Sequence, residues 1–269
     1  MKTNNYIILR SRYYLSVFVI LNLLFQIFPP PTMSHAIEHT LRTETIICEG
    51  TDYQTVAYFF SSEIEGPTVM IIAGVHGDEL AGIKASKQFM ENFEPERGTV
   101  IIIPEVNKEA CENRVRTMPL EEDLNRVYPG DSKAQDIARL AGELFEIMEV
   151  NEIDFLLDLH ESIEHYQVNP SHYGQTIILD DDNEPFLREI SDYLVNQLNR
   201  LVFLPGNYFK VIIEPIIGCS TYEALNRHGI PGITFETSTR IDFCKRVTFH
   251  YHCIRNILNY FEIISLSHT

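Results

Sequence analysis

The sequence is short of positive charge: 21 lysine and arginine residues stand against 38 aspartate and glutamate residues, for a formal net charge of −17. A protein that binds nucleic acid neutralises phosphates with lysine and arginine, so this balance argues against a nucleic-acid partner. Repeats and low-complexity linkers are also missing after residue 36. With 269 residues and 45% hydrophobic content, the chain can build one sizeable core, and we predict one folded domain.

Two familiar binding patterns are absent as well. Cysteine occurs only five times, an odd number, and no two cysteines form a C-x-x-C pair. A disulfide framework is therefore not implied, and we expect most of these cysteines to be small buried thiols. The glycines at 74, 77 and 82 follow the spacing G-x-x-G-x-x-x-x-G with no Lys-Ser or Lys-Thr after them, which argues against a nucleotide-binding loop.

The first 36 residues contain no acidic side chain. Three basic residues come first, an almost wholly apolar run follows at 13–28, and three prolines then end any helix. Small residues stand three before and one before a cut after Ala36, which completes the pattern of a secretory signal peptide. The apolar run is shorter than the roughly 20 residues that span a bilayer, so we expect a cleaved leader rather than a permanent anchor.

This leader decides the predicted location of the protein. Cleavage after Ala36 leaves residues 37–269 as a secreted, periplasmic or otherwise extracytoplasmic domain, in contact with a membrane only if the signal stays uncleaved. If Met33 is instead the true start, the upstream residues are not part of the protein and it is cytoplasmic.

Short apolar runs alternate with amphipathic stretches along the rest of the chain. We predict strands at 43–48, 55–60, 68–73, 99–104, 153–160, 175–180 and 232–236. We predict helices at 80–93, 132–150 capped by Ser132, 183–201 capped by Asp182 or Asn183, 220–229 and 242–264. This alternation is typical of a layered α/β fold, in which ligands gather at the carboxyl ends of the strands.

Three of the apolar strands end on ionisable residues. The first is followed by His76 and Glu79, the second ends at Asp158 and His160, and the third ends at Glu236. A charge at the end of a buried strand is costly unless it is paired, metal-bound or hydrated. Three such cases on one sheet predict a common site.

His76, Glu79 and His160 are the candidate metal ligands. Imidazole nitrogen and carboxylate oxygen both suit Zn²⁺ at roughly 2.0–2.2 Å, although Co²⁺ or Mn²⁺ also accept them. Gly74 and Gly77 let the backbone turn tightly beside a ligand. Three protein ligands leave the fourth zinc position open for water, which is the arrangement of a catalytic zinc rather than a structural one.

Simpler interpretations remain open for several of these residues. His76 and Glu79 could form a solvent-facing polar turn that caps a helix starting at Leu80. Asp158 lies two residues before His160 and leaves the same face of the strand. It either orients an imidazole or serves as a cap or loop acceptor.

Glu236 ends the strand at 232–236 on the face opposite Ile233 and Phe235. A carboxylate beside a metal-bound water can take its proton and later deliver it to the leaving group. The alternative is a salt bridge at the end of the strand.

A polar segment at 107–131 lies between the candidate ligands. The planar fork of Arg126 suits a substrate carboxylate, with Asn125 as support. Arg116 could stabilise an oxyanion, although the sequence barely separates it from Arg114.

The order of these motifs resembles a known family. "HGDE", a later N-x-x-A with a downstream arginine, "DLNRVYPG", "DLH" and a strand ending in glutamate look like the succinylglutamate desuccinylase/aspartoacylase group, which is related to the M14 zinc carboxypeptidases. The likeness spans roughly residues 68 to 240. It implies a three-layer α/β/α sandwich with a mixed, twisted sheet of about eight strands, as a single zinc hydrolase domain within 37–269.

The resemblance also implies a role for each candidate residue. One Zn²⁺ per chain would be held by His76, Glu79 and His160, and Glu236 would be the general acid/base. Arg116 would polarise the scissile carbonyl, and Asn125 with Arg126 would hold the substrate carboxylate. The implied partner is a small carboxylate-bearing amide or peptide.

The chain departs from the family pattern in two places. Lys108 follows Asn107 where the family has Asn-Pro, and the chain stops soon after Glu236, so we expect it to lack the additional C-terminal β domain of aspartoacylases. We therefore predict a zinc hydrolase for an amide bond next to a free carboxylate. Its substrate is either an N-acyl amino acid or, as the leader favours, a cell-wall peptide. The alternative is a catalytically inactive zinc-dependent ligand-binding protein.

Overall fold

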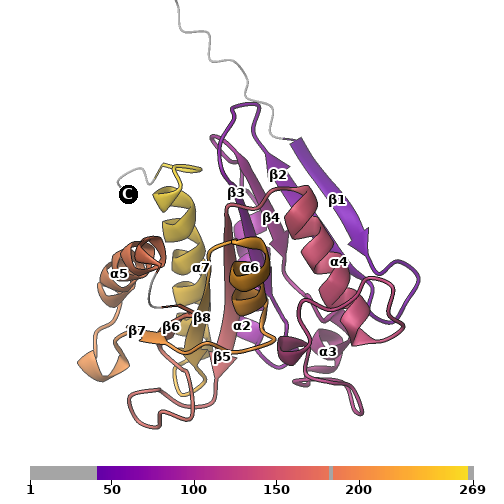
Figure 1. Ribbon diagram of the computed structural model, residues 1–269. Coiled ribbons are helices and arrows are strands. Elements are labelled where there is room, and N and C mark those ends of the chain that lie inside the picture. The colour runs from indigo at the N-terminus through magenta and orange to yellow at the C-terminus, as the bar shows by residue number, and fades with distance from the viewer. Residues whose placement is uncertain (1–40, 182–183, 266–269) are drawn as a thin grey trace, which may run out of the picture. The chain divides into compact units, whose positions relative to one another are not determined.

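The computed structural model describes residues 41–181 and 184–265 (Figure 1). Eight strands form one sheet in the order β1-β2-β4-β3-β5-β8-β6-β7. The strands are β1 (Leu41–Ile47), β2 (Thr55–Ser61), β3 (Thr68–Ala73), β4 (Thr99–Ile103), β5 (Phe155–Ser162), β6 (Thr176–Leu179), β7 (Lys210–Ile213) and β8 (Gly232–Ser238). The central strands β4, β3, β5 and β8 are parallel, whereas β1, β2 and β6 introduce antiparallel pairs. The predicted mixed α/β sheet is confirmed.

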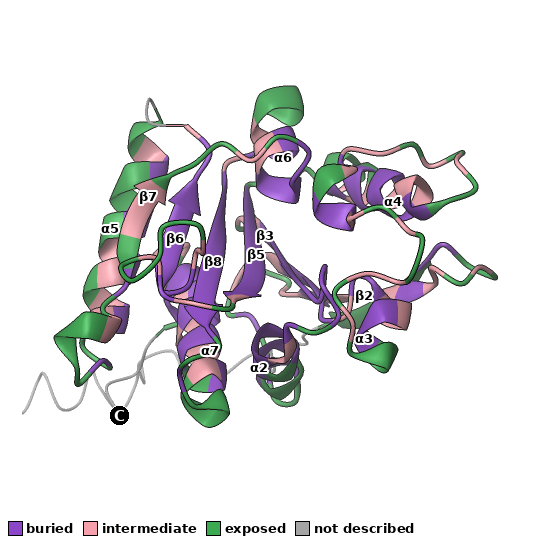
Figure 2. Ribbon diagram, turned by 90° about the horizontal axis from the view of Figure 1, so that it is seen from below, coloured by how far each residue is buried: buried purple, intermediate pink, exposed green. Residues whose placement is uncertain are grey.

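Helices cover both faces of this sheet, as Figure 2 shows. They are α2 (Leu80–Met90), α3 (Lys108–Asn113), α4 (Ile137–Val150), α5 (Pro185–Asn199), α6 (Ser220–His228) and α7 (Phe243–Tyr260), with short 3₁₀ turns η1 (Leu124–Arg126) and η2 (Pro205–Asn207). One apolar cluster joins the sheet to α2, α5 and α7, and a second joins it to α4 and α6. These two clusters form the core.

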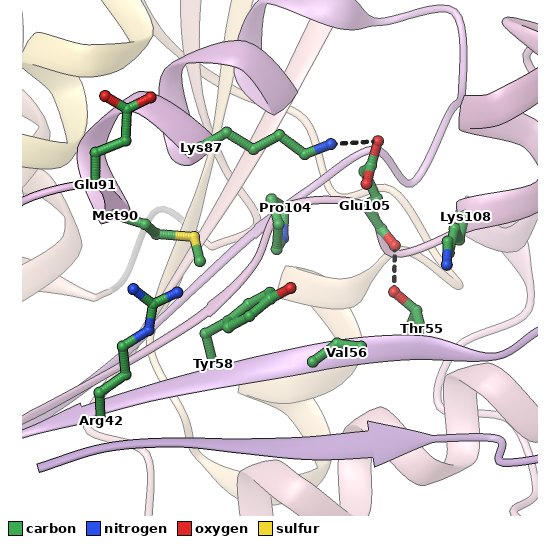
Figure 3. A pocket seen from close by; sticks show the side chains of 10 residues that line it. All are labelled: Arg42, Thr55, Val56, Tyr58, Lys87, Met90, Glu91, Pro104, Glu105 and Lys108. Atoms are coloured by element: carbon green, nitrogen blue, oxygen red, sulfur yellow. Dashed lines mark hydrogen bonds and ion pairs between the residues drawn. The ribbon is translucent and has the colours of Figure 1, made fainter.

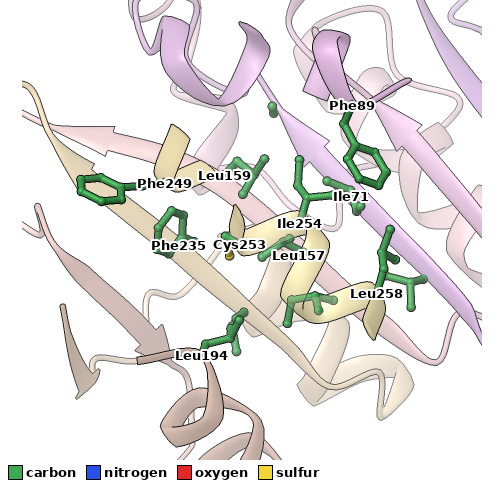
Figure 4. Close-up of a cluster of buried hydrophobic side chains, with 14 of the residues drawn as sticks. Ile71, Phe89, Leu157, Leu159, Leu194, Phe235, Phe249, Cys253, Ile254 and Leu258 are labelled. Carbon is green, nitrogen blue, oxygen red and sulfur yellow. The ribbon is translucent and has the colours of Figure 1, made fainter. Parts of the chain in front are cut away.

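The central strands are buried on both faces because their side chains alternate between these clusters. In β3, Val69 and Ile71 pack towards α2 and α7, while Met70 and Ile72 pack towards α4. Figure 4 shows the first cluster, in which Ile71 and Leu157 from the sheet lie close to Ile254 of α7. Continuous apolar runs in the sequence follow from this two-sided burial.

The helix predicted at 132–150 begins five residues later than expected. Its N-cap is Asp136, whose carboxylate accepts a hydrogen bond of 3.0 Å from the backbone N–H of Ala138. The Ser132 hydroxyl instead contacts the carboxylate of Glu146. The caps predicted at 182 and 183 lie outside the described residues.

Other elements were missed because their sequence signals are weak. Strand β7 has four residues, none of them buried, at one edge of the sheet. The polar segment at 107–131 contains the six-residue helix α3 and the turn η1. Short or exposed elements bury too little apolar surface to produce a periodic pattern.

The cysteine prediction is confirmed: all five are free thiols, and four are buried, with Cys244 the exposed one. Among the described residues, no helix is both long and apolar enough to cross a membrane. The predicted leader lies outside the described part of the chain.

Candidate metal and active site

His76 and Glu79 lie on the turn that connects β3 to α2. Gly74 adopts a left-handed backbone with φ of +71° just after the strand. A Cβ atom at Gly77 would fall 2.0 Å from the carbonyl carbon of Ala110, so the turn packs directly on α3. Glycine is therefore required at 77 for the side chains of His76 and Glu79 to reach their positions.

His160 is supplied by β5, and its register partner in β8 is Glu236. Glu79 stands between the two imidazoles, with Oε1 2.7 Å from His76 Nδ1 and Oε2 2.9 Å from His160 Nδ1. The candidate ligand atoms of the three residues lie within 4.8 Å of one another, and all three side chains are buried. The structure thus brings the predicted ligands together.

The outer nitrogens of both rings also face carboxylates. His76 Nε2 lies 3.0 Å from Asp123 Oδ1. His160 Nε2 lies 3.1 Å from Asp158 Oδ1, although the angles are not those of a hydrogen bond. Imidazoles that bind metals usually carry such a carboxylate on the nitrogen opposite the metal.

This donor set fits a divalent cation. A neutral imidazole has one N–H, yet both rings here have acidic oxygens at both nitrogens. Either both rings are protonated, or a cation at the centre takes the two Nδ1 lone pairs and the Glu79 carboxylate. Two nitrogens and one oxygen are typical ligands of catalytic zinc.

The electrostatics of the cluster set burial against the attraction of opposite charges. Burial alone would raise the pKa of Glu79, but the charges of His76 and His160 lower that pKa far below its ordinary value. Burial likewise opposes charge on both histidines, yet the neighbouring carboxylates raise the pKa of each imidazole. Mutual stabilisation of opposite charges dominates this buried site.

The helix-cap interpretation of Glu79 is wrong. Its side chain makes no capping hydrogen bond, although it occupies the N-cap position of α2. The backbone N–H of Ala81 at the start of that helix donates instead to Glu161 Oε2, at 2.9 Å. Glu161 lies on the opposite face of β5 from His160, as the alternation along the strand requires.

Glu236 is buried beside the cluster, and its Oε2 has no hydrogen-bond partner among the described residues. Burial first, and then the negative charge of Glu79, raise the pKa of Glu236 to about 8. Within the described part of the chain it forms no ion pair, so the alternative of a strand-end salt bridge is not observed. Buried carboxyl groups with a strongly raised pKa are common at functional sites, so Glu236 is a candidate for proton exchange.

A cleft of about 210 Å³ opens beside these residues. It is lined by all the predicted site residues except His160, namely His76, Glu79, Arg116, Asn125, Arg126 and Glu236. The Arg116 guanidinium lies 2.9 Å from Asp123 Oδ2 and 3.5 Å from Glu79 Oε1. Arg114 does not line the cleft and instead ends α3 with a φ of +54°.

Sequence reasoning missed several residues of the site. Asp123 bridges His76 and Arg116, and a signal for it was present as the first letter of "DLNR". His172 and Tyr173 line the cleft from the loop that follows β5. That loop has no periodic pattern, so no sequence signal pointed to it.

The fold and the site together define an α/β protein with a mixed eight-stranded sheet and a buried His-Glu-His cluster at the ends of its central strands. Residues 65–177 match the model of the succinylglutamate desuccinylase/aspartoacylase catalytic domain. The matched stretch contains the motifs "HGDE", "DLNRVYPG" and "DLH", on which the predicted resemblance rests.

Curated relatives match parts of the chain. An N-alpha-acetyl-L-2,4-diaminobutyric acid deacetylase of Halomonas elongata is 35% identical over 120 residues, which cover 44% of this chain and 34% of that protein. An aspartoacylase of Xenopus tropicalis is 28% identical over 175 residues, which cover 60% of this chain and 52% of that protein. The matches thus extend over about a third to a half of these relatives' length.

Solved structures share the fold. The mDAP-bound form of Csd4 from Helicobacter pylori, a D,L-carboxypeptidase, has a TM-score of 0.67 at 22% identity, covering 74% of this chain and 52% of that one. An aspartoacylase family protein of Mesorhizobium loti has a TM-score of 0.64 at 20% identity, and the match covers 88% of this chain and 71% of that one.

Proposed function

We propose that this protein is a zinc-dependent hydrolase that cleaves an amide bond next to a free carboxylate. The observation that carries the proposal is the buried His76–Glu79–His160 cluster with the unpaired carboxyl group of Glu236 beside it, in one cleft. When bound by these three residues, zinc would polarise a water molecule and the scissile carbonyl.

Glu236 is the general acid/base of the proposed reaction. As a carboxylate it accepts the proton of the attacking water, and it then delivers that proton to the departing amine nitrogen. Burial is the largest cause that raises the pKa of Glu236, and it acts whether or not a cation offsets the negative charge of Glu79. The unpartnered Oε2 is the atom that would carry the proton.

Three side chains of the polar segment orient the substrate. Arg126 and Asn125 line the cleft and hold the substrate carboxylate. Arg116 stabilises the oxyanion, and Asp123 holds its guanidinium at the edge of the cluster.

The substrate is either an N-acyl amino acid or a peptide of the cell wall. The Halomonas elongata deacetylase and the aspartoacylases favour the first class. The carboxypeptidase neighbour, which binds mDAP and a tripeptide, and the predicted leader favour the second. Incubating the purified, zinc-loaded protein with N-acetyl amino acids and with mDAP-containing peptides, and detecting released amine, separates the two classes.

Replacing Glu236 by Gln removes the proton carrier while keeping the shape of the side chain. We expect turnover to fall by about 10²–10⁴-fold, because that is the usual contribution of a positioned acid/base. Zinc content, measured by atomic absorption, should stay at one per chain. The matched control is Glu91→Gln, an exposed position outside the cleft, which should leave turnover unchanged. Full activity of Glu236→Gln would refute the role of Glu236.

Two further outcomes bear on the proposal as a whole. Bound zinc and bound ligand without turnover on either substrate class would favour the inactive binding protein. The same preparation also tests export: N-terminal sequencing of protein recovered outside the cytoplasm should begin at residue 37. An intact residue 1 or a start at Met33 would contradict the predicted leader.

A further inference from the structure

Two arginines line the catalytic cleft, and only one of them is paired within the described part of the chain. The Arg116 guanidinium lies 2.9 Å from Asp123 and 3.5 Å from Glu79. Arg126 donates to the backbone carbonyl oxygen of Asn125 at 2.5 Å and forms no ion pair with a described residue. In the proposed reaction Arg126 holds the substrate carboxylate, so one anionic group of the substrate occupies the one unpaired guanidinium.

The other charged groups near Arg126 are mainly acidic. Burial first, and then the charge of Glu214, raise the pKa of Tyr173, which also lines the cleft. Glu236 adds to this rise and Arg126 opposes it, so all three charges act on one wall of the cleft. His172 lines the cleft too, but an imidazole is charged only when protonated. In the proposed reaction water and the scissile carbonyl take the zinc position, so a second carboxylate would meet acidic groups.

Two isoleucines give the same cleft an apolar part. Ile163 and Ile216 both line it, and Ile163 is 63% exposed. Ile217, the next residue along the chain, is 71% exposed. Single exposed apolar residues are common on protein surfaces, but these border a cleft that has to hold a substrate. A substrate with apolar groups that cover them removes apolar surface from water.

The segment that carries Ile216 is fixed against Arg126. Gly218 has a φ of +83°, and a Cβ atom there would fall 2.6 Å from the backbone oxygen of Arg126. The Gly218 carbonyl accepts a hydrogen bond from the Tyr128 backbone N–H at 3.1 Å, and the Ile216 N–H donates to Asp180 at 3.4 Å. Since Ile216 and Arg126 also line one cleft, Ile216 borders the end at which the carboxylate would be held.

The cleft is also small. Its volume of about 210 Å³ lies below the roughly 300–1,000 Å³ of sites that bury drug-sized ligands. This volume favours an acylated amino acid over a longer peptide.

We propose that the cleft accepts the N-acyl derivative of an amino acid with one carboxylate and an apolar side chain. This inference rests on the proposed hydrolase function and narrows its substrate class. Arg126 holds the carboxylate, and the apolar parts of the substrate cover Ile163 and Ile216. A dicarboxylic substrate brings a second charge that no free arginine of the described cleft meets.

Three N-acetyl amino acids of nearly equal shape test the proposal. The leucine derivative has an apolar side chain, the asparagine derivative a polar one, and the aspartate derivative a second carboxylate. Their dissociation constants are measured by isothermal titration calorimetry on zinc-loaded Glu236→Gln, in which hydrolysis is suppressed. We expect the leucine derivative to bind about tenfold more tightly than the asparagine derivative, because apolar surface is buried, and the aspartate derivative to bind most weakly. This variant has lost a negative charge, so the comparison is not biased against aspartate.

Ile216→Arg, added to the same background, supplies a second cation. It should tighten binding of the aspartate derivative by about tenfold and weaken binding of the leucine derivative. The matched control is Val56→Arg, because Val56 is also half-buried and lines the cavity drawn in Figure 3, which shares no residue with the catalytic cleft. This control should leave the order of affinities unchanged. Ile216→Ser is a milder change that should weaken binding of the leucine derivative alone.

Three results would overturn the proposal. They are tighter binding of the aspartate than of the leucine derivative, equal binding of the leucine and asparagine derivatives, and no detectable binding of any of the three. Turnover by the unaltered zinc-loaded protein tests the proposed function separately. Hydrolysis of the aspartate derivative alone would contradict this substrate class and leave the hydrolase standing. Binding in the expected order without any turnover would contradict the hydrolase and leave the selectivity standing.

Discussion

At the scale of single residues, the site depends on carboxylates that hold other side chains. Asp123 is the clearest case, because one oxygen contacts His76 Nε2 and the Asn125 backbone N–H while the other contacts Arg116. The His76 charge helps to lower the pKa of Asp123 well below its usual range, against the opposing effect of burial. One carboxylate thus contacts a candidate metal ligand and two residues that line the cleft.

Asp123→Asn should therefore weaken zinc binding by about 10–100-fold, the usual loss when the partner of a ligating imidazole is replaced. Zinc affinity is measured by competition with a chromogenic chelator. Asp136→Asn is the matched control, because Asp136 caps α4 and contacts no residue of the site. Equal affinities for the two variants would show that Asp123 has no part in holding the metal.

The grouping of the candidate metal ligands could be predicted from the sequence, whereas their supporting contacts could not. His76 and Glu79 follow β3, His160 lies near the end of β5, and parallel neighbours align their carboxyl ends. Asp123 contacts His76 across 47 residues, from a polar segment without periodicity. Nothing local in a sequence specifies which of several nearby charges such a residue will meet.

At the scale of the elements, Glu161 ties α2 and α7 to the strand that carries His160. It accepts the Ala81 backbone N–H at the start of α2 and pairs with Arg246 of α7. Both charged groups are largely buried, with side chains 1% and 13% exposed. The face of β5 opposite the metal site is thereby fixed to two helices.

Arg246→Met would leave the Glu161 charge buried without its partner. We expect a loss of about 3–5 kcal/mol in the free energy of unfolding, measured by urea denaturation. The double variant Glu161→Gln/Arg246→Met removes the unpaired buried charge as well, so its free energy of unfolding should fall by less. Lys108→Met breaks the exposed pair with Glu112 and should cost under about 1 kcal/mol. A loss no larger for Arg246→Met than for Lys108→Met would contradict this role.

Element boundaries show where sequence patterns stop being informative. The strand at 68–73 was predicted with its observed limits because it is continuously apolar. The start of α4 was misplaced, since Ser132 and Asp136 are both good N-caps and tertiary contacts chose the second.

At the scale of the whole molecule, the candidate metal site joins three neighbouring strands. Its side chains come from the turn after β3, from β5 and from β8, which are adjacent in the sheet. A metal that binds these residues binds the folded chain and not the unfolded one, so it stabilises the fold.

Removing zinc with EDTA should therefore lower the melting temperature, and adding zinc back should restore it. At a free zinc concentration 100 times the dissociation constant, the stabilisation is about 2.7 kcal/mol. Differential scanning calorimetry measures the effect, and His160→Asn is the control that should melt at the same temperature with and without zinc. An unchanged melting temperature for the unaltered protein would mean that the cluster holds no metal.

The order of the strands along the chain has a consequence for biosynthesis. β8 is the last strand to leave the ribosome, yet it pairs with β5 at the centre of the sheet. His76, Glu79 and His160 therefore leave the ribosome before the strand that flanks β5 and carries Glu236, so the candidate site is complete only once the last described strand has been synthesised.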